Sequence, residues 1–138
     1  MLYESLPKNE SVFDFEAKGE TTGETYKGQF TVMCVLNMSG RHALELEKTR
    51  LMADYANPSR GLAGIAISLA TVRAKIIDAP AWWKNSDEGS LIIDENVVLT
   101  LYDKCNEVEA KWRKSLKSQS EEAQADSKEE TKEPVADQ

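Results

Sequence analysis

Apolar and polar side chains alternate over two neighbouring stretches near the start of the chain. In residues 11–17, Phe13 and Phe15 face one way while Asp14 and Glu16 face the other, and this period of two predicts a half-buried strand. Residues 18–24 hold two glycines and two threonines and predict a turn. Residues 1–10 show no clear period, so we expect them to form a flexible N-terminus.

A second alternating stretch follows the turn. One of its faces carries every second residue, namely Tyr26, Gly28, Phe30, Val32, Cys34 and Leu36. The opposite face also becomes apolar near the end, at Met33 and Val35. The two stretches therefore predict an antiparallel β-hairpin whose second strand is buried on both sides.

The spacing of apolar residues becomes helical from residue 38 onwards. Asn37 or Ser39 can cap a first helix, which Asn57-Pro58 ends because proline disfavours a helical residue before it. Ser59 can cap the next helix. The apolar stripe of the first helix consists of Leu44, Leu51 and Tyr55.

Residues 61–78 predict a second helix that is apolar on nearly all sides. Its main stripe has spacings of 3, 4, 3 and 4 and consists of Leu62, Ile65, Leu69, Val72 and Ile76. Alanines and further isoleucines extend the apolar surface around the helix. Such a helix either lies at the centre of a core or also contacts a partner.

A last helix follows the segment 79–83 and a polar turn at 84–90. Asp94 is placed to cap it. Its stripe consists of Val98, Leu101, Cys105, Val108, Trp112 and Leu116. Two favourable ion pairs one helical turn apart support it, Glu107 with Lys111 and Glu109 with Arg113.

These elements predict an α+β fold, in which an N-terminal antiparallel β-hairpin is followed by a three-helix region within a single domain, residues 11–117. The chain of 138 residues carries a net charge of −7. Residues 118–138 contain seven acidic residues, two lysines and no aromatic residue. Because such a segment cannot bury enough apolar surface to fold, we expect a disordered acidic tail, which serves either solubility or docking.

The acidic balance also limits the classes of partner. Phosphate backbones need a basic surface, so we expect no nucleic acid, and anionic membranes offer no attraction either. The longest uncharged stretch, residues 61–72, is shorter than the roughly 20 residues of a membrane span. No secretory signal is visible at residues 1–5, and two cysteines cannot form a disulfide framework. We expect a soluble intracellular protein.

No residue pattern indicates catalytic chemistry. His42 is the only histidine, and Cys34 and Cys105 are too far apart in sequence for a metal motif and are expected to be buried free thiols. The neighbouring carboxylates Asp87-Glu88 and Asp94-Glu95 give no sign of converging in a pocket. We therefore expect no catalytic residue, no metal, no cofactor and no enzymatic activity.

A protein-binding site is the stronger candidate. Pro80, Trp82 and Trp83 stand together at a helix–loop junction, and tryptophan is enriched where a large ring fills a partner's pocket. Alternatively, one indole fills the core and the other covers a helix end. With the apolar second helix, the candidate protein-binding residues are Leu62, Ile65, Leu69, Pro80, Trp82 and Trp83.

The order of these signals resembles the tail assembly chaperones of long-tailed bacteriophages. The resemblance covers about residues 11–116 and rests on a glycine-aromatic strand, an Ala-Pro-Ala-Trp-Trp junction and a capped helix that follows. The segments concerned are residues 26–32, 76–83, 91–98 and 109–113.

The resemblance implies a non-enzymatic protein that binds the tape-measure protein and keeps it soluble while the tail is assembled. It implies a location in the host cytoplasm and absence from the mature virion. The major tail protein is a further candidate partner, and the apolar residues of the second helix and the tryptophan junction form either the client surface or a self-association surface. Two other classes stay open. One is a virion structural protein of the tail-completion or head–tail connector type, and the other is an enzyme or small-molecule binder with a pocket between the hairpin and the helices.

Overall fold

The computed structural model describes residues 6–53 and 60–136, with side chains described in the second range for residue 61 and residues 63–118. A three-stranded antiparallel sheet and four helices make up this part of the chain, which confirms the α+β class. In chain order the elements are β1 Glu10–Lys18, β2 Thr25–Met33, α1 Met38–Met52, α2 Arg60–Lys75, β3 Ile76–Asp78, α3 Ala81–Lys84 and α4 Glu95–Ala136.

The predicted hairpin is confirmed. β1 and β2 pair antiparallel with Phe13 opposite Phe30 and Phe15 opposite Gly28, so the aromatic residues lie on the inner face of the sheet. β2 is the central strand because β3 pairs with its other edge. Val32 is fully buried on one face of β2, whereas Thr31 and Met33 on the other face are half-buried.

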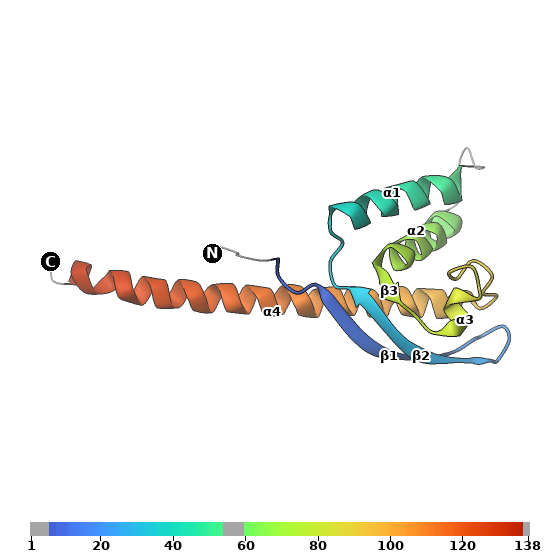
Figure 1. The fold of residues 1–138 in the computed structure, drawn as a ribbon, viewed down its shortest axis with the longest axis horizontal. Helices are drawn as coiled ribbons and strands as arrows, with labels where there is room; N and C mark the ends of the chain where they lie inside the picture. Colours follow the sequence, from blue (N-terminus) through green and yellow to red (C-terminus); the bar gives the residue numbers. More distant parts are fainter. Residues whose placement is uncertain (1–5, 54–59, 137–138) are drawn as a thin grey trace.

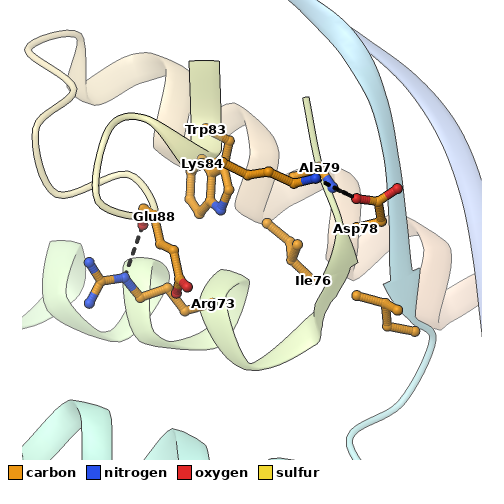
Figure 2. A pocket seen from close by; sticks show the side chains of 8 residues that line it. Arg73, Ile76, Asp78, Ala79, Trp83, Lys84 and Glu88 are labelled. Atoms are coloured by element: carbon orange, nitrogen blue, oxygen red, sulfur yellow. Dashed lines mark hydrogen bonds and ion pairs between the residues drawn. The ribbon is translucent and has the colours of Figure 1, made fainter. Parts of the chain in front are cut away.

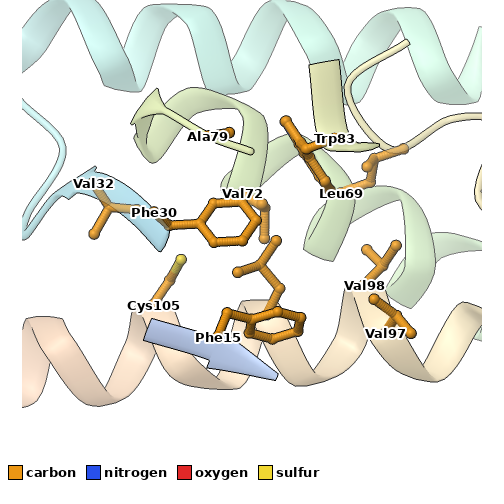
Figure 3. Packing of buried hydrophobic residues seen from close by; sticks show 11 residues of the cluster. Phe15, Phe30, Val32, Leu69, Val72, Ala79, Trp83, Val97, Val98 and Cys105 are labelled. Carbon is orange, nitrogen blue, oxygen red and sulfur yellow. The ribbon is translucent and has the colours of Figure 1, made fainter. Parts of the chain in front are cut away.

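The N-terminal half of α4 lies between the sheet and the pair α1 and α2, while its C-terminal half projects beyond the domain (Figure 1). α2 packs against both α1 and α4, and β1 packs against α4. Figure 3 shows the resulting core, in which Phe15 and Phe30 from the sheet meet Val72 of α2 and Cys105 of α4. The predicted stripe of the last helix is confirmed, since Val98, Leu101 and Cys105 are buried.

The predicted second helix is too long at its end. α2 stops at Lys75, and residues 76–78 form the short strand β3. Two β-branched isoleucines just before Ala79-Pro80 favour extended backbone. A run of three residues shows no period that could distinguish a strand from a helix, so only the pairing with β2 reveals it.

Lys8 and Asn9, in the segment expected to be flexible, make contacts that the sequence did not predict. β1 begins at Glu10, and the Asn9 side chain donates to the Val35 carbonyl at 2.6 Å and accepts from the Val35 amide at 2.9 Å. The Trp112 indole donates to the Lys8 carbonyl at 2.8 Å. Polar groups provide these contacts, and a hydrophobic pattern does not report them.

Other details of the helices agree with the sequence. The Asn37 side chain caps α1 by accepting from the Gly40 amide at 2.8 Å. Both predicted ion pairs on α4 form, with Lys111 3.4 Å from Glu107 and Arg113 3.3 Å from Glu109. The predicted helix end at Asn57-Pro58 and the cap at Ser59 lie outside the described residues.

The acidic segment continues α4 as far as Ala136. Side chains are described only to Ser118, so the disorder of residues 118–138 stays a prediction. None of the helices in the described ranges is long and apolar enough to cross a membrane.

Candidate protein-binding surface

An apolar groove lies where α2, the loop before α4 and the first turns of α4 meet. Its cavity volume is about 170 Å³. α2 supplies Ile65 and Leu69, two of the residues that the sequence singled out. The remaining lining residues come from the loop and from α4: Gly89, Ser90, Ile92, Ile93, Glu95, Val98 and Leu99.

The loop places large apolar side chains in solvent beside this groove. Leu91 is 70% exposed and Ile93 is 68% exposed, although Ile92 between them is half-buried against the core. Folding normally buries such side chains, and an apolar patch rimmed by polar residues marks an interaction site. We define the apolar groove as Ile65, Leu69, Leu91, Ile92, Ile93, Val98 and Leu99.

Arg73 of α2 holds the start of this loop. Its guanidinium donates to the backbone carbonyls of Asp87 at 2.6 Å and Glu88 at 2.9 Å, and also to the Ser90 hydroxyl. Figure 2 shows the bond to Glu88. A third nitrogen lies 2.9 Å from a carboxylate oxygen of Glu47 on α1, so a single side chain joins α1, α2 and the loop.

The loop backbone is strained at the residues that Arg73 holds. Asp87 and Glu88 have φ angles of 52° and 51°, in the left-handed region that residues other than glycine rarely adopt. Gly89 follows with a φ of 92°. Strain of this kind persists only where surrounding contacts impose it, and the guanidinium bonds supply such contacts.

Trp83 lies beneath the apolar groove and is only 2% exposed. A Cβ built on Gly89 would come within 2.6 Å of the Trp83 ring and 3.0 Å of Leu69. Trp83 is therefore not available to a partner in this conformation, and it supports the loop from below. This agrees with the alternative in which one indole fills the core.

Trp82 and Pro80 lie at a different place, over the part of β2 that β3 does not reach. The Trp82 indole donates to the Lys27 carbonyl at 3.0 Å, and its ring lies 5.2 Å from Tyr26 and 5.6 Å from Phe30 between centroids. Pro80 lies against Gly28, where an added Cβ would come within 2.6 Å of it. Both residues cover the sheet edge and are half-buried.

Asp94 has a role that the sequence did not suggest. Its backbone carbonyl accepts from the Val97 amide at 3.0 Å at the start of α4, but its carboxylate accepts hydrogen bonds from the turn of the hairpin instead of from its own helix. The donors are the Thr21 and Thr22 amides at 2.8 and 2.9 Å, the Thr22 hydroxyl at 2.6 Å and the Tyr26 hydroxyl at 2.8 Å.

These bonds explain the electrostatics of Asp94, which is fully buried. The hydrogen bond from the Thr22 hydroxyl lowers the pKa of Asp94 to about 2, and the bonds from the Thr22 amide, the Tyr26 hydroxyl and the Thr21 amide add to it against the opposing effect of desolvation. A carboxylate whose acceptor sites are occupied in this way is not free to act as a base. Asp94 therefore joins the hairpin to α4 and has a structural role.

The other chemically reactive residues are dispersed. His42 is exposed on α1, while Cys34 and Cys105 are both buried free thiols, as predicted. Burial raises the pKa of the Cys105 thiol to about 11, which keeps it protonated and unreactive. Among the described residues, no group of three or more His, Cys, Asp or Glu side chains could hold a metal ion.

The structure thus unites only part of the predicted set. Ile65 and Leu69 lie in the apolar groove, Pro80 and Trp82 lie at the sheet edge, and Trp83 lies in the core. The side chain of Leu62 lies outside the described residues. The exposed residues Leu91 and Ile93 were not among the predicted binding residues, although three successive apolar residues after a polar turn were a visible signal.

Comparison of the chain with protein-family models, with curated proteins and with solved structures finds no match.

Proposed function

We propose that this protein is a non-enzymatic tail assembly chaperone that binds an amphipathic helix of a bacteriophage tape-measure protein and keeps it soluble during tail assembly. The observation that carries the proposal is the apolar groove, which is lined by Ile93, 68% exposed, with Leu91, 70% exposed, two residues earlier in the same loop. The resemblance of the sequence to this family supplies the identity of the client.

The shape of the groove favours a helix as the occupant. Its walls are α2 on one side and the start of α4 on the other, with the isoleucines of the loop between them. A helix presents apolar side chains at positions i, i+3, i+4 and i+7, which can enter such a groove in a row. A long client with apolar helix faces would aggregate alone, because those faces would pair with each other.

The charge of the chain supports a solubilising role. The net charge of −7 is concentrated in residues 118–138, and residues 118–136 of this segment continue α4 away from the domain (Figure 1). A charged extension keeps a complex dispersed through mutual repulsion. We propose a location in the host cytoplasm, with the major tail protein and further copies of the chain as additional partners.

Co-expression with the candidate tape-measure protein tests the proposal. We expect the wild-type chain to bring the client into the soluble fraction and to co-purify with it. The double variant Leu91→Ser with Ile93→Ser removes two exposed apolar side chains and leaves every buried residue unchanged. We expect it to bring much less client into the soluble fraction than the wild type does. Leu46→Ser is the matched control, because Leu46 is 58% exposed on α1 away from the groove.

Two results contradict the proposal. One is a folded double variant that keeps the client soluble as well as the wild type does. The other is the presence of this chain at ring stoichiometry in purified particles by mass spectrometry, which identifies a virion structural protein of the tail-completion or connector type instead.

A further inference from the structure

β1 is the outer strand of the sheet, and one of its edges is free. The strand order is β1-β2-β3, and within residues 6–53 and 60–136 no strand pairs with the other side of β1. At the two ends of the hairpin, the Cys34 amide donates to the Asn9 carbonyl at 3.1 Å and the Gly19 amide donates to the Glu24 carbonyl at 2.8 Å. The odd-numbered residues of β1 therefore form the hydrogen-bonded pairs with β2, and the backbone groups of the even-numbered residues point away from it.

Side chains of α4 bind this free edge at its two ends. Trp112 donates to the Lys8 carbonyl and Asn96 donates to the Lys18 carbonyl, each at 2.8 Å. Both carbonyls belong to even-numbered residues, which agrees with the pairing pattern. Between them, the backbone groups of Glu10, Val12, Asp14 and Glu16 have no hydrogen-bond partner among the described residues.

Two cavities line this unpaired stretch between β1 and α4. Their volumes are about 370 Å³ and about 250 Å³. Lys104 and Glu107 line both cavities, and we call the two neighbouring cavities together the edge groove. β1 packs against α4, and in Figure 1 the strand starts at α4 and runs at an angle to it.

The edge groove is distinctly acidic. Five carboxylates line it, from Glu10, Asp14, Glu16, Asp103 and Glu107, against the two ammonium groups of Lys104 and Lys111. Phe13 and Val108 add apolar surface at its inner side. An extended partner here would have to place positive charges beside the carboxylates and small apolar side chains toward α4.

We propose that the edge groove binds an extended basic peptide segment, which adds to β1 as a fourth antiparallel or parallel strand. The unpaired amides and carbonyls of the even-numbered residues would supply the backbone hydrogen bonds, and the carboxylates would select lysine or arginine at alternate positions. A second copy of β1 is a poor occupant, because its own carboxylates would meet those of the first copy.

This site is separate from the apolar groove and does not depend on the proposed chaperone role. It involves β1 and residues 100–112 of α4, whereas the apolar groove involves α2, the loop and residues 95–99. The two can therefore be tested separately, and the experiment below uses the purified full chain without any client.

A synthetic peptide as long as β1, nine residues, with alternating lysine and valine, is the probe, and a peptide with glutamate in place of lysine is its control. We expect fluorescence anisotropy to show binding of the lysine peptide that weakens with added salt, and no binding of the glutamate peptide. Asp14→Lys combined with Glu16→Lys should weaken binding by roughly tenfold or more. Both side chains are exposed, so this variant should fold.

A backbone test separates strand addition from charge attraction. Val12→Pro removes an outward-facing amide, a position that tolerates proline in an edge strand, and it should weaken binding by roughly tenfold, whereas Val12→Thr should not. If Val12→Pro fails to fold, N-methylation of alternate peptide amides should weaken binding instead. Equal binding of both peptides, unchanged binding after these backbone changes, or a dimer in solution that Val12→Pro abolishes would each overturn the proposal.

Discussion

The Thr22 hydroxyl lies 2.6 Å from a carboxylate oxygen of Asp94, although the two residues are 72 positions apart in the sequence. The bond joins the turn of the hairpin to the first residue before α4. Gly19, also in this turn, lies so close to the same carboxylate that a Cβ there would collide with it. The hairpin and the longest helix are therefore held in one arrangement by a buried polar contact as well as by the apolar core.

Replacing Asp94 by Asn should destabilise the fold. The variant keeps the size of the side chain and one acceptor oxygen, which can still accept from the Thr21 and Thr22 amides. Its NH2 group replaces the oxygen that accepts from the Thr22 and Tyr26 hydroxyls, so these two charge-assisted hydrogen bonds are lost. We expect thermal unfolding to shift down by roughly 5–10 °C. The neighbouring Glu95→Gln is the control, since Glu95 is exposed and its loss should shift the transition by only about 2 °C.

The wild-type chain and the Asp94→Asn variant should also differ in how their melting temperatures depend on pH. The pKa of Asp94 is about 2 in the folded protein, below its ordinary value of 3.8, so the unfolded chain binds the proton more readily. The stabilisation is present above the ordinary pKa and is lost as pH falls through about 2. The gap in melting temperature between wild type and Asp94→Asn should therefore narrow between pH 5 and pH 2, and a constant gap would contradict this account.

Gly89→Ala should be far more harmful than Gly23→Ala. Both glycines have a positive φ, 92° and 76°, but a Cβ on Gly89 meets the Trp83 ring at 2.6 Å while a Cβ on Gly23 meets nothing. Backbone strain costs roughly 1 kcal/mol at either site, and the collision adds about 1–3 kcal/mol at Gly89. Urea unfolding of the two variants measures the difference, and similar costs would show that Trp83 can move aside.

Arg73→Lys should loosen the loop that forms the rim of the apolar groove. A lysine cannot hold the Asp87 and Glu88 carbonyls together with Glu47, so amides such as that of Leu91, which donates to Ser86 at 2.9 Å, should exchange with solvent at least about tenfold faster. The exchange rates of the β2 backbone amides should increase much less than those of the loop amides.

Arg50→Lys provides the matched control for this loop. Arg50 binds the same Glu47 carboxylate at 2.9 Å, but its side chain is 60% exposed and touches no loop carbonyl. Equal acceleration of exchange in both variants would show that Arg73 acts through α1 and not through the loop.

Glu109→Ala should lower the free energy of unfolding, because it leaves a buried charge without its partner. The Lys75 ammonium lies 2.9 Å from the Glu109 carboxylate, and the Lys75 side chain is only 3% exposed while that of Glu109 is 31% exposed. Removing the carboxylate leaves the ammonium without this partner in the core, at a cost of about 3 kcal/mol, the lower end of the range for a buried pair because Glu109 is partly exposed. Glu107→Ala breaks only surface pairs with Lys104 and Lys111 and should leave urea unfolding almost unchanged.

Much of the fold could be predicted from the sequence where one element buries one face. The alternation around Phe13 and Phe15 predicted β1, and the stripe from Val98 to Leu116 predicted the start and the inner face of α4. In each case the signal is a local period, because side chains on one face of a strand or helix recur at fixed intervals. The free buried thiols followed from the same patterns.

The candidate site was predictable only in part. Ile65 and Leu69 could be recognised on an apolar helix. Trp83 was selected because tryptophan is enriched at protein-binding sites, but it is a core residue. A tryptophan in sequence does not reveal whether its ring enters the core or faces solvent. Gly89 decides this for Trp83, since it leaves room for the ring beneath the loop.

The sequence by itself determined the α+β class, the hairpin, the helical stripes and the separation of charge into the last 21 residues, because each depends on neighbours in the chain. Only the tertiary structure decided that residues 76–78 add a third strand, that Asp94 serves the hairpin turn, that the apolar groove forms and that one edge of β1 stays unpaired. Those features depend on contacts between residues far apart in sequence, and a local pattern does not encode which distant partners meet.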